Sequence, residues 1–100
     1  MPFDPAIRQL IATLRGSPHW NSEQDLRLLR ALWPKVVGKH LATATSVASV
    51  DGARIVIRVP DKTWTRQLYA IRGQLLRKIN EPWPNRWITH IGFTYEDKRN

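Results

Sequence analysis

Apolar residues recur along the N-terminal part of this chain with the spacing of an α-helix. Over residues 5–15 they fall on one face, which consists of Ile7, Leu10, Ile11 and Leu14. Asp4 can cap the free N–H groups of such a helix, Pro5 tolerates its first position, and Gly16 ends it. The pattern therefore predicts an amphipathic helix over 5–15.

A second helical pattern follows the loop around Trp20. Ser22 and Asp25 have the spacing of a capping box, and the apolar face after them consists of Leu26, Leu29 and Trp33. Pro34 cannot donate a helical hydrogen bond, and its ring clashes with the carbonyl four residues earlier. We therefore expect a break or bend near Trp33, or a new helix over 35–41.

Thr, Ala, Ser and Val dominate after Leu41, and they predict two strands, 43–50 and 53–59. Asp51 and Gly52 lie where a two-residue hairpin turn needs positive φ. The register that follows from this turn pairs Val50 with Ala53, Ala48 with Ile55, and Ser46 with Ile57.

A long helix is predicted over 62–80, after a cap at Asp61. Its apolar stripe consists of Trp64, Leu68, Ile71, Leu75 and Ile79. The run 81–85, which is rich in proline, ends the helix, and a third strand is expected over 87–95.

The predicted order is α-α-β-β-α-β, without internal repeats, in a single domain spanning residues 1–100. A helix between the second and third strands implies a right-handed crossover if these strands are parallel neighbours. The fold class is α+β, a two-layer sandwich in which helices pack on one face of a three-stranded sheet. So short a chain leaves the other face partly exposed.

Charge adds a functional indication to this fold. The chain has 16 Lys and Arg against 8 Asp and Glu, a formal net charge of +8, which favours an anionic partner such as a nucleic acid. Residues 62–80 contain no acid, although surface helices commonly mix Glu with Lys. The alternative is a solvated cationic face without a ligand.

The cations of this helix lie across from its apolar stripe or flank it. The residues expected to bind nucleic acid are Lys62, Arg66, Arg72, Arg77 and Lys78 on the helix, with Arg54 and Arg58 on the hairpin extending the same surface. A straight helix would give Lys62 to Arg77 a reach of about 22 Å, enough to follow several phosphates.

Five tryptophans in 100 residues is unusual. Trp33 and Trp64 belong to apolar stripes and are expected in the core, and Trp87 begins the third predicted strand. Trp20 and Trp83 lie in predicted loops, where they are candidates for stacking on bases or for contact with a partner protein.

The sequence contains no signature of an enzyme. Gly38-Lys39-His40 lacks the upstream glycine and the following Ser or Thr of a P-loop, which excludes an ATPase motor of that type. His19, His40 and His90 are scattered without a carboxylate at metal-ligand spacing. We therefore expect no catalytic residue, metal, cofactor or small-molecule substrate.

The composition also bears on the compartment. The chain has no cysteine for a disulfide framework. No apolar run approaches the length of a membrane-spanning helix, and the N-terminus lacks the order of a signal peptide. We expect a cytoplasmic, nucleoid-associated protein without a membrane partner.

Several short runs, in this order and spacing, resemble the DciA family over residues 24–95. They are Trp33-Pro34-x-x-Val37-Gly38, Val50-Asp51-Gly52, Ile55-Val56-Ile57-Arg58-Val59, Trp64, Leu68, Leu75-Leu76, Ile79-Asn80, Ile88, Ile91 and Phe93. The resemblance implies a KH-like core and a non-enzymatic bacterial helicase loader. It also implies binding to the DnaB-type replicative helicase and to single-stranded or tailed DNA.

Two features of this sequence differ from those of the DciA family and of KH domains. Many members of the family carry a long basic extension, which these 100 residues do not include. The Gly-x-x-Gly loop by which KH domains clamp a nucleic-acid backbone occurs nowhere in the sequence. Any contact with DNA must therefore use a different arrangement.

Two other classes remain open from the sequence. The same charge and a KH-like sheet suit a small RNA-binding or ribosome-associated module, which binding to structured RNA would identify. A metal-free ribonuclease, in which Arg, Lys and His stabilise the transition state, would instead cleave bulk RNA.

Overall fold

The structure of the protein, a computed structural model, describes residues 3–83 and 87–96. Within them the elements are α1 (Pro5–Arg15), α2 (Ser22–Val37), α3 (Lys39–Ala44), β1 (Ser46–Asp51), β2 (Arg54–Arg58), α4 (Lys62–Ala70), α5 (Arg72–Asn80) and β3 (His90–Thr94). The predicted α-α-β-β-α-β order is confirmed, but the second and third predicted helices are each divided in two.

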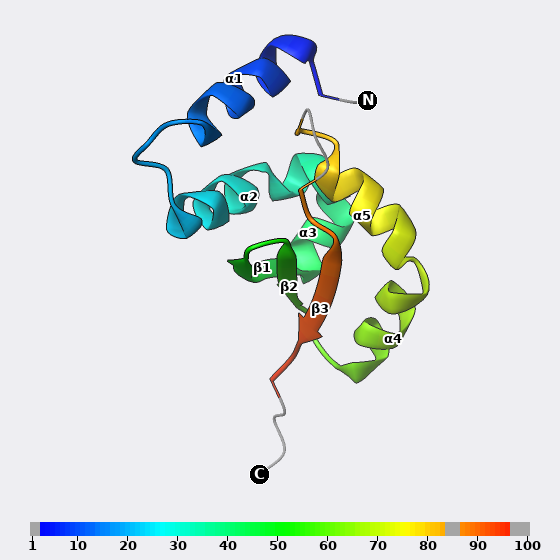
Figure 1. The fold of residues 1–100 in the computed structure, drawn as a ribbon. Coiled ribbons are helices and arrows are strands. Elements are labelled where there is room, and N and C mark those ends of the chain that lie inside the picture. The colour runs from blue at the N-terminus through cyan, green and yellow to red at the C-terminus, as the bar shows by residue number, and fades with distance from the viewer. Residues whose placement is uncertain (1–2, 84–86, 97–100) are drawn as a thin grey trace.

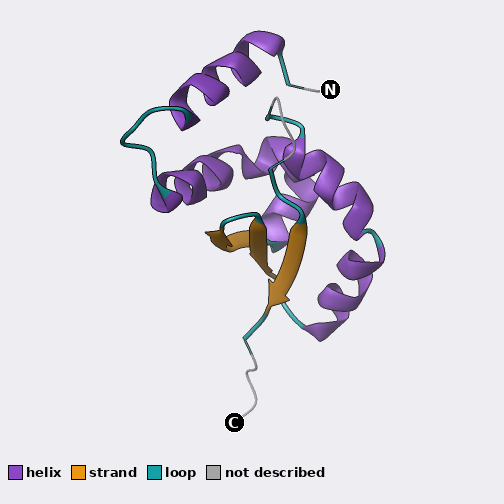
Figure 2. Ribbon diagram, in the orientation of Figure 1, coloured by secondary structure: helices purple, strands orange, loops and turns teal. Residues whose placement is uncertain are grey.

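The three strands form one sheet in the order β1-β2-β3, and the helices other than α1 lie on one of its faces (Figure 2). β1 and β2 are antiparallel, whereas β2 and β3 are parallel and are joined by the crossover through α4 and α5. The predicted α+β class is confirmed, and the arrangement is compatible with a small KH-like sandwich. The core consists of Leu29, Trp33, Val36, Val37, Val47, Ile55, Ile57, Val59, Leu68, Leu75, Ile79, Trp83 and Ile88, together with Ile11 of α1.

Helix α1 has the predicted bounds and caps. The Asp4 carboxylate accepts a hydrogen bond from the Ala6 N–H at 2.8 Å, and Gly16 is the C-cap. Figure 1 shows α1 beyond α2, away from the sheet. Of its apolar face Ile11 is buried, whereas the other three side chains, Ile7, Leu10 and Leu14, are 39%, 58% and 41% exposed.

The start and the end of α2 both differ from the prediction. Its capping box pairs Asn21 with Gln24, one residue before the predicted pair of Ser22 and Asp25. The helix also continues through Pro34 to Val37. Pro34 and Arg30 are exposed, so water can bond the Arg30 carbonyl that proline leaves without a helical donor.

The helical break comes at Gly38, whose φ of 92° and ψ of 154° are accessible to glycine. Its N–H donates to the Pro34 carbonyl and ends α2, while its own carbonyl accepts from Ala42 and begins α3. The predicted new helix over 35–41 is therefore wrong in position, because α3 starts four residues later.

The predicted hairpin turn lies one residue too early, so the register beside it is wrong by two residues. Asp51 pairs with Arg54, so that Gly52 (φ 60°) and Ala53 form the turn. Val50 then faces Ile55, and a β-bulge between Val47 and Ser49 shifts the register again, which places Val47 opposite Ile57. The bulge restores the alternation that keeps the large apolar side chains of both strands on the core side.

The predicted helix over 62–80 breaks at Ile71 (φ −112°, ψ 23°). A straight helix of that length would measure about 28 Å, whereas the five-residue strands β2 and β3 measure about 17 Å. The break lets Leu68, Leu75 and Ile79 remain buried over so short a sheet, while Ile71 becomes 36% exposed.

The third strand is shorter than predicted, since β3 begins at His90 and Trp87 precedes it. Helix α5 ends at Asn80, as expected from the run 81–85. The last two residues of this run, Pro84 and Asn85, lie outside the described residues.

Candidate nucleic-acid interface

The five cations predicted on the long helix are all exposed, although two helices carry them. α4 contributes two and α5 contributes three, and together we call them the helical cations: Lys62, Arg66, Arg72, Arg77 and Lys78. Because the break at Ile71 changes the course of the helix, they do not form the predicted straight ridge of about 22 Å.

No acidic side chain of the described residues forms an ion pair with the helical cations. The ion pairs in residues 3–83 and 87–96 join Arg15 to Asp25 and Arg27 to Glu23, both on other elements. The acids that flank the two helices are Asp61, which caps α4 through the Trp64 N–H, and the exposed Glu81. The helical cations are therefore exposed without an ion-pair partner among the described residues, although Glu81 lines a pocket together with Arg77.

An exposed aromatic ring lies at the junction of the two helices. Tyr69 is 52% exposed, and the Arg72 guanidinium lies 4.2 Å from its ring centroid and donates to its carbonyl at 3.2 Å. An exposed aromatic ring beside an arginine is suited to stacking on unpaired bases. Sequence reasoning missed Tyr69, although an aromatic residue off the apolar stripe of a basic segment is a usable signal.

Arg54 and Arg58 do not extend the helical surface, which corrects the prediction. They alternate along β2 with Ile55 and Ile57, which are 0% and 1% exposed beneath the helices, so the two arginines lie on the open face of the sheet. There the Arg54 guanidinium lies over Gly92 of β3, where an added Cβ would come within 2.7 Å of its Nη2. The predicted cations thus form two surfaces on opposite sides of the sheet.

Neither Trp20 nor Trp83 presents the fully exposed ring expected of a residue that stacks on bases or contacts a partner protein. Trp83 is 2% exposed and packs edge-to-face against Trp87, with ring centroids 5.0 Å apart. Trp20 is half-buried, and its Nε1–H donates to the Asp25 carboxylate at 2.6 Å. Trp83 is therefore a core residue, and Trp20 helps to fix the start of α2.

The core tryptophans follow the prediction more closely. Trp33 is buried, and its Nε1–H donates to the Thr45 hydroxyl at 3.0 Å. Trp64 is half-buried and packs against the core. The five rings thus contribute mainly to packing in this fold.

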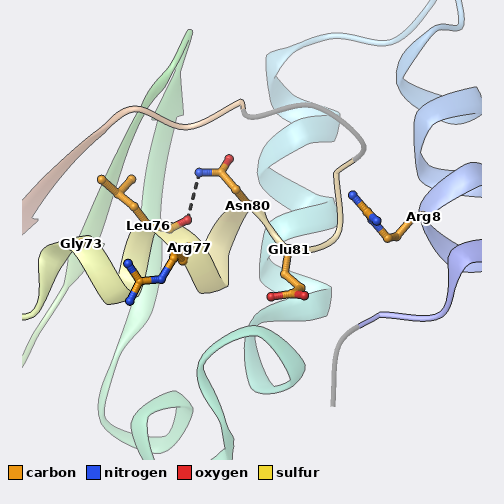
Figure 3. A pocket seen from close by; sticks show the side chains of 6 residues that line it. All are labelled: Arg8, Gly73, Leu76, Arg77, Asn80 and Glu81. Carbon is orange, nitrogen blue, oxygen red and sulfur yellow. Dashed lines mark hydrogen bonds between the residues drawn. The ribbon is translucent and has the colours of Figure 1, made fainter.

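A pocket of about 560 Å³ lies between α1 and α5 (Figure 3). Its lining residues are Arg8, Gly73, Leu76, Arg77, Asn80 and Glu81. Figure 3 shows the Glu81 side chain between those of Arg77 and Arg8, and Arg8 donates to the Trp83 carbonyl at 2.8 Å. Because these charges are mixed, the pocket is less suited to a phosphate chain than the helical cations other than Arg77, which lines it.

The described residues contain no group of three or more His, Cys, Asp or Glu side chains that could hold a metal ion. In the same residues, every helix is too short or too polar to cross a bilayer.

Comparison with known proteins gives two similarities. The model of the family described as "Dna[CI] antecedent, DciA" matches residues 6–93. The UPF0232 protein BL0636 of Bifidobacterium longum (strain NCC 2705) is 30% identical over 92 residues, which cover 91% of this chain and 59% of that relative. The chain therefore spans about three fifths of the length of the curated relative that it matches.

Proposed function

The chain belongs to the DciA family, and from this membership we propose that it is a non-enzymatic adaptor of bacterial DNA replication. It binds the DnaB-type replicative helicase and single-stranded or tailed DNA, and it promotes loading of the helicase without hydrolysing ATP. The proposal assigns no catalytic, metal-binding or cofactor-binding residue. It places the protein in the cytoplasm, at the nucleoid.

The observation that carries the DNA-binding part is the exposure of all five helical cations on α4 and α5, in a stretch, residues 62–80, that contains no acid. A single strand presents one phosphate per nucleotide, and cations that release its counterions supply most of the non-specific affinity. The exposed ring of Tyr69 adds an apolar contact of the kind that unpaired bases use. Four phosphate contacts would give a slope of about −3 for the logarithm of the affinity against that of the salt concentration.

Loading also requires a preference among states of the helicase. A ligand that binds the closed and the opened ring with equal affinity shifts neither. The adaptor must therefore bind the opened or rearranged ring more tightly, and its hold on the strand places DNA beside that opening.

The helicase part is tested by gel filtration of the chain with a purified DnaB-type helicase. A loading assay follows, on a fork covered with single-strand-binding protein. We expect co-elution and faster loading, at a rate that does not depend on any nucleotide hydrolysis by the chain itself. Separate elution together with unchanged loading would exclude the adaptor function.

The DNA part is tested with the double variant Arg66→Glu/Arg77→Glu in a fluorescence-anisotropy titration with single-stranded DNA at low salt. Both residues are exposed, so we expect weaker binding and a shallower salt slope without unfolding. The matched control is Lys35→Glu/Lys39→Glu, which changes the charge equally on α2 and α3. Equal losses in the two variants would show that net charge, rather than this surface, determines affinity.

A small RNA-binding module remains the alternative, because a KH-like sheet serves RNA as well as DNA. Competition between single-stranded DNA and structured RNA for the same surface distinguishes the two functions. Preferential displacement by RNA, without any effect on helicase loading, would favour the alternative.

A further inference from the structure

A second concave site lies at the free edge of β1, remote from the α4–α5 surface. This groove has a volume of about 360 Å³, and α2, α3, β1 and β2 all contribute to it. Its lining includes Arg30, Pro34, Ala42, Thr45, Ser46 and Arg58, and none of its lining residues is acidic. We call it the β1 groove.

Arg30 reaches the β1 groove from the exposed side of α2. Its Nε donates to the Val47 carbonyl at 3.0 Å, which holds the guanidinium against the edge of the strand. Within the described residues, the Arg30 side chain makes this one hydrogen bond, although a guanidinium carries five N–H donors. The remaining donors are free to bind a ligand in the groove.

Arg58 reaches the same groove from β2. It pairs with Ser46 across the two strands, on the open face of the sheet. In the part of the chain that the structure describes, its guanidinium has no ion pair and no hydrogen-bond partner. Arg30 and Arg58 thus bring two guanidinium groups and the hydroxyl of Ser46 to one groove.

Protection of the edge strand β1 explains the position of Arg30 in the groove, but it does not explain the position of Arg58. A cation laid along an exposed strand discourages pairing with another chain, and the Arg30 bond to Val47 meets that purpose. A second cation in the same groove adds like-charge repulsion, which a bound anion would remove. Planar, forked guanidinium groups are the donors best matched to phosphate oxygens.

We propose that the β1 groove binds a phosphate group, with the Arg30 and Arg58 guanidiniums and the Ser46 hydroxyl as its donors. The inference deepens the proposed function and rests on it for the source of the phosphate, which is either the 5′ end or an internal diester of a DNA strand. The strand then contacts the protein on both sides of the sheet, through the helical cations and through the β1 groove.

Two matched pairs of variants test the proposal by anisotropy with a short oligothymidylate, with and without a 5′-phosphate. Arg58→Gln is expected to weaken binding about tenfold, whereas Arg27→Gln, an equal loss of charge on α2 outside the groove, changes it less than twofold. Ser46→Asp places a carboxylate in the groove and is expected to weaken binding similarly, whereas Ser49→Asp, outside the groove, is not.

The two oligonucleotides distinguish the sources of the phosphate. A loss confined to the 5′-phosphorylated strand assigns the groove to a terminal phosphate, and equal loss with both strands assigns it to a diester. The proposal would be overturned if Arg58→Gln and Arg27→Gln had equal effects and Ser46→Asp bound no more weakly than Ser49→Asp.

An NMR titration with inorganic phosphate separates this inference from the proposed function. The Arg30 Nε–H and Ser46 N–H signals are expected to shift in the native chain and to stay unchanged in Ser46→Asp. Shifts with phosphate in a chain that binds no oligonucleotide would refute DNA binding and leave the groove as an anion site. Loss of DNA binding in Arg66→Glu/Arg77→Glu, without any effect of the groove variants, would refute the groove alone.

Discussion

Asn80 and Ile88 exchange two hydrogen bonds, although they lie eight positions apart. The Asn80 Nδ2 donates to the Ile88 carbonyl at 2.9 Å, and the Ile88 N–H donates to the Asn80 Oδ1 at 2.8 Å. The same amide also donates to the Leu76 carbonyl and accepts from the Trp87 N–H. One side chain therefore joins the end of α5 to the segment that enters β3, as a paired strand would.

Replacing Asn80 with Asp should destabilise the protein strongly. The change removes both N–H donors and places a carboxylate next to the carbonyls of Leu76 and Ile88, in a part-buried site. We expect the free energy of unfolding to fall by about 3 kcal/mol, measured by urea denaturation. Gln74→Glu, an exposed amide-to-acid change on the same helix, should alter it by less than about 0.5 kcal/mol. Equal effects would mean that the four bonds of Asn80 contribute little.

The docking of α1 depends on Arg15, which is a second relationship that sequence patterns do not reveal. Its Nε donates to the Asp25 carboxylate at 2.9 Å, and its guanidinium lies 3.9 Å from the centroid of one Trp87 ring. Lysine cannot make both contacts, because it lacks a planar group with several fixed donors.

For Arg15→Lys we therefore expect the amide protons of α1 to exchange with solvent about tenfold faster, measured by NMR hydrogen exchange. The control is Arg27→Lys, because the Arg27–Glu23 pair is exposed on both sides and contributes little. Unchanged protection of α1 in Arg15→Lys would show that Ile11 and Arg8 suffice to dock the helix.

Local signals in the sequence predicted α1, the two strands of the hairpin and the helical segment between the second and third strands. Asp4, Pro5 and Gly16 act within one turn of α1, so their effect is the same in any fold. The α4–α5 break could not be predicted in this way. It depends on the length of the sheet that the helix covers, which is a tertiary quantity.

The same distinction applies to the candidate site. Composition indicated that the seven predicted cations would be exposed, and they are. Their division between two faces follows from the β2 alternation and the packing of the helices, which place Arg54 and Arg58 on the face away from Ile55 and Ile57. Trp83 was misassigned because proline and asparagine around it indicate a loop, whereas Arg8, Arg15 and Trp87 cover the Trp83 residue itself.

Tyr69 gives a prediction about bases rather than phosphates. If its ring stacks on an unpaired base, Tyr69→Ala should weaken binding of single-stranded DNA about tenfold, because one stacked base contributes about 1–3 kcal/mol. Tyr69→Phe should bind as the native chain does, since the ring is kept. Leu10→Ala controls for the loss of an exposed apolar side chain, on α1. Equal anisotropy curves for Tyr69→Ala and Tyr69→Phe would exclude stacking.

Two glycines should respond in opposite directions to alanine, because only one of them has a backbone conformation that strains alanine. A Cβ at Gly38 or at Gly73 would meet no atom within 4 Å, so neither substitution causes a clash. Gly38 has a φ of 92° and a ψ of 154°, a conformation that alanine adopts only with strain, whereas Gly73 lies within α5.

We expect Gly38→Ala to lower the free energy of unfolding by about 1–3 kcal/mol. Gly73→Ala should raise it by about 0.5–1 kcal/mol, because alanine loses less entropy in a helix. Thermal unfolding of both variants measures the difference, and a Gly38→Ala variant as stable as the native chain would mean that the α2–α3 connection does not require this conformation.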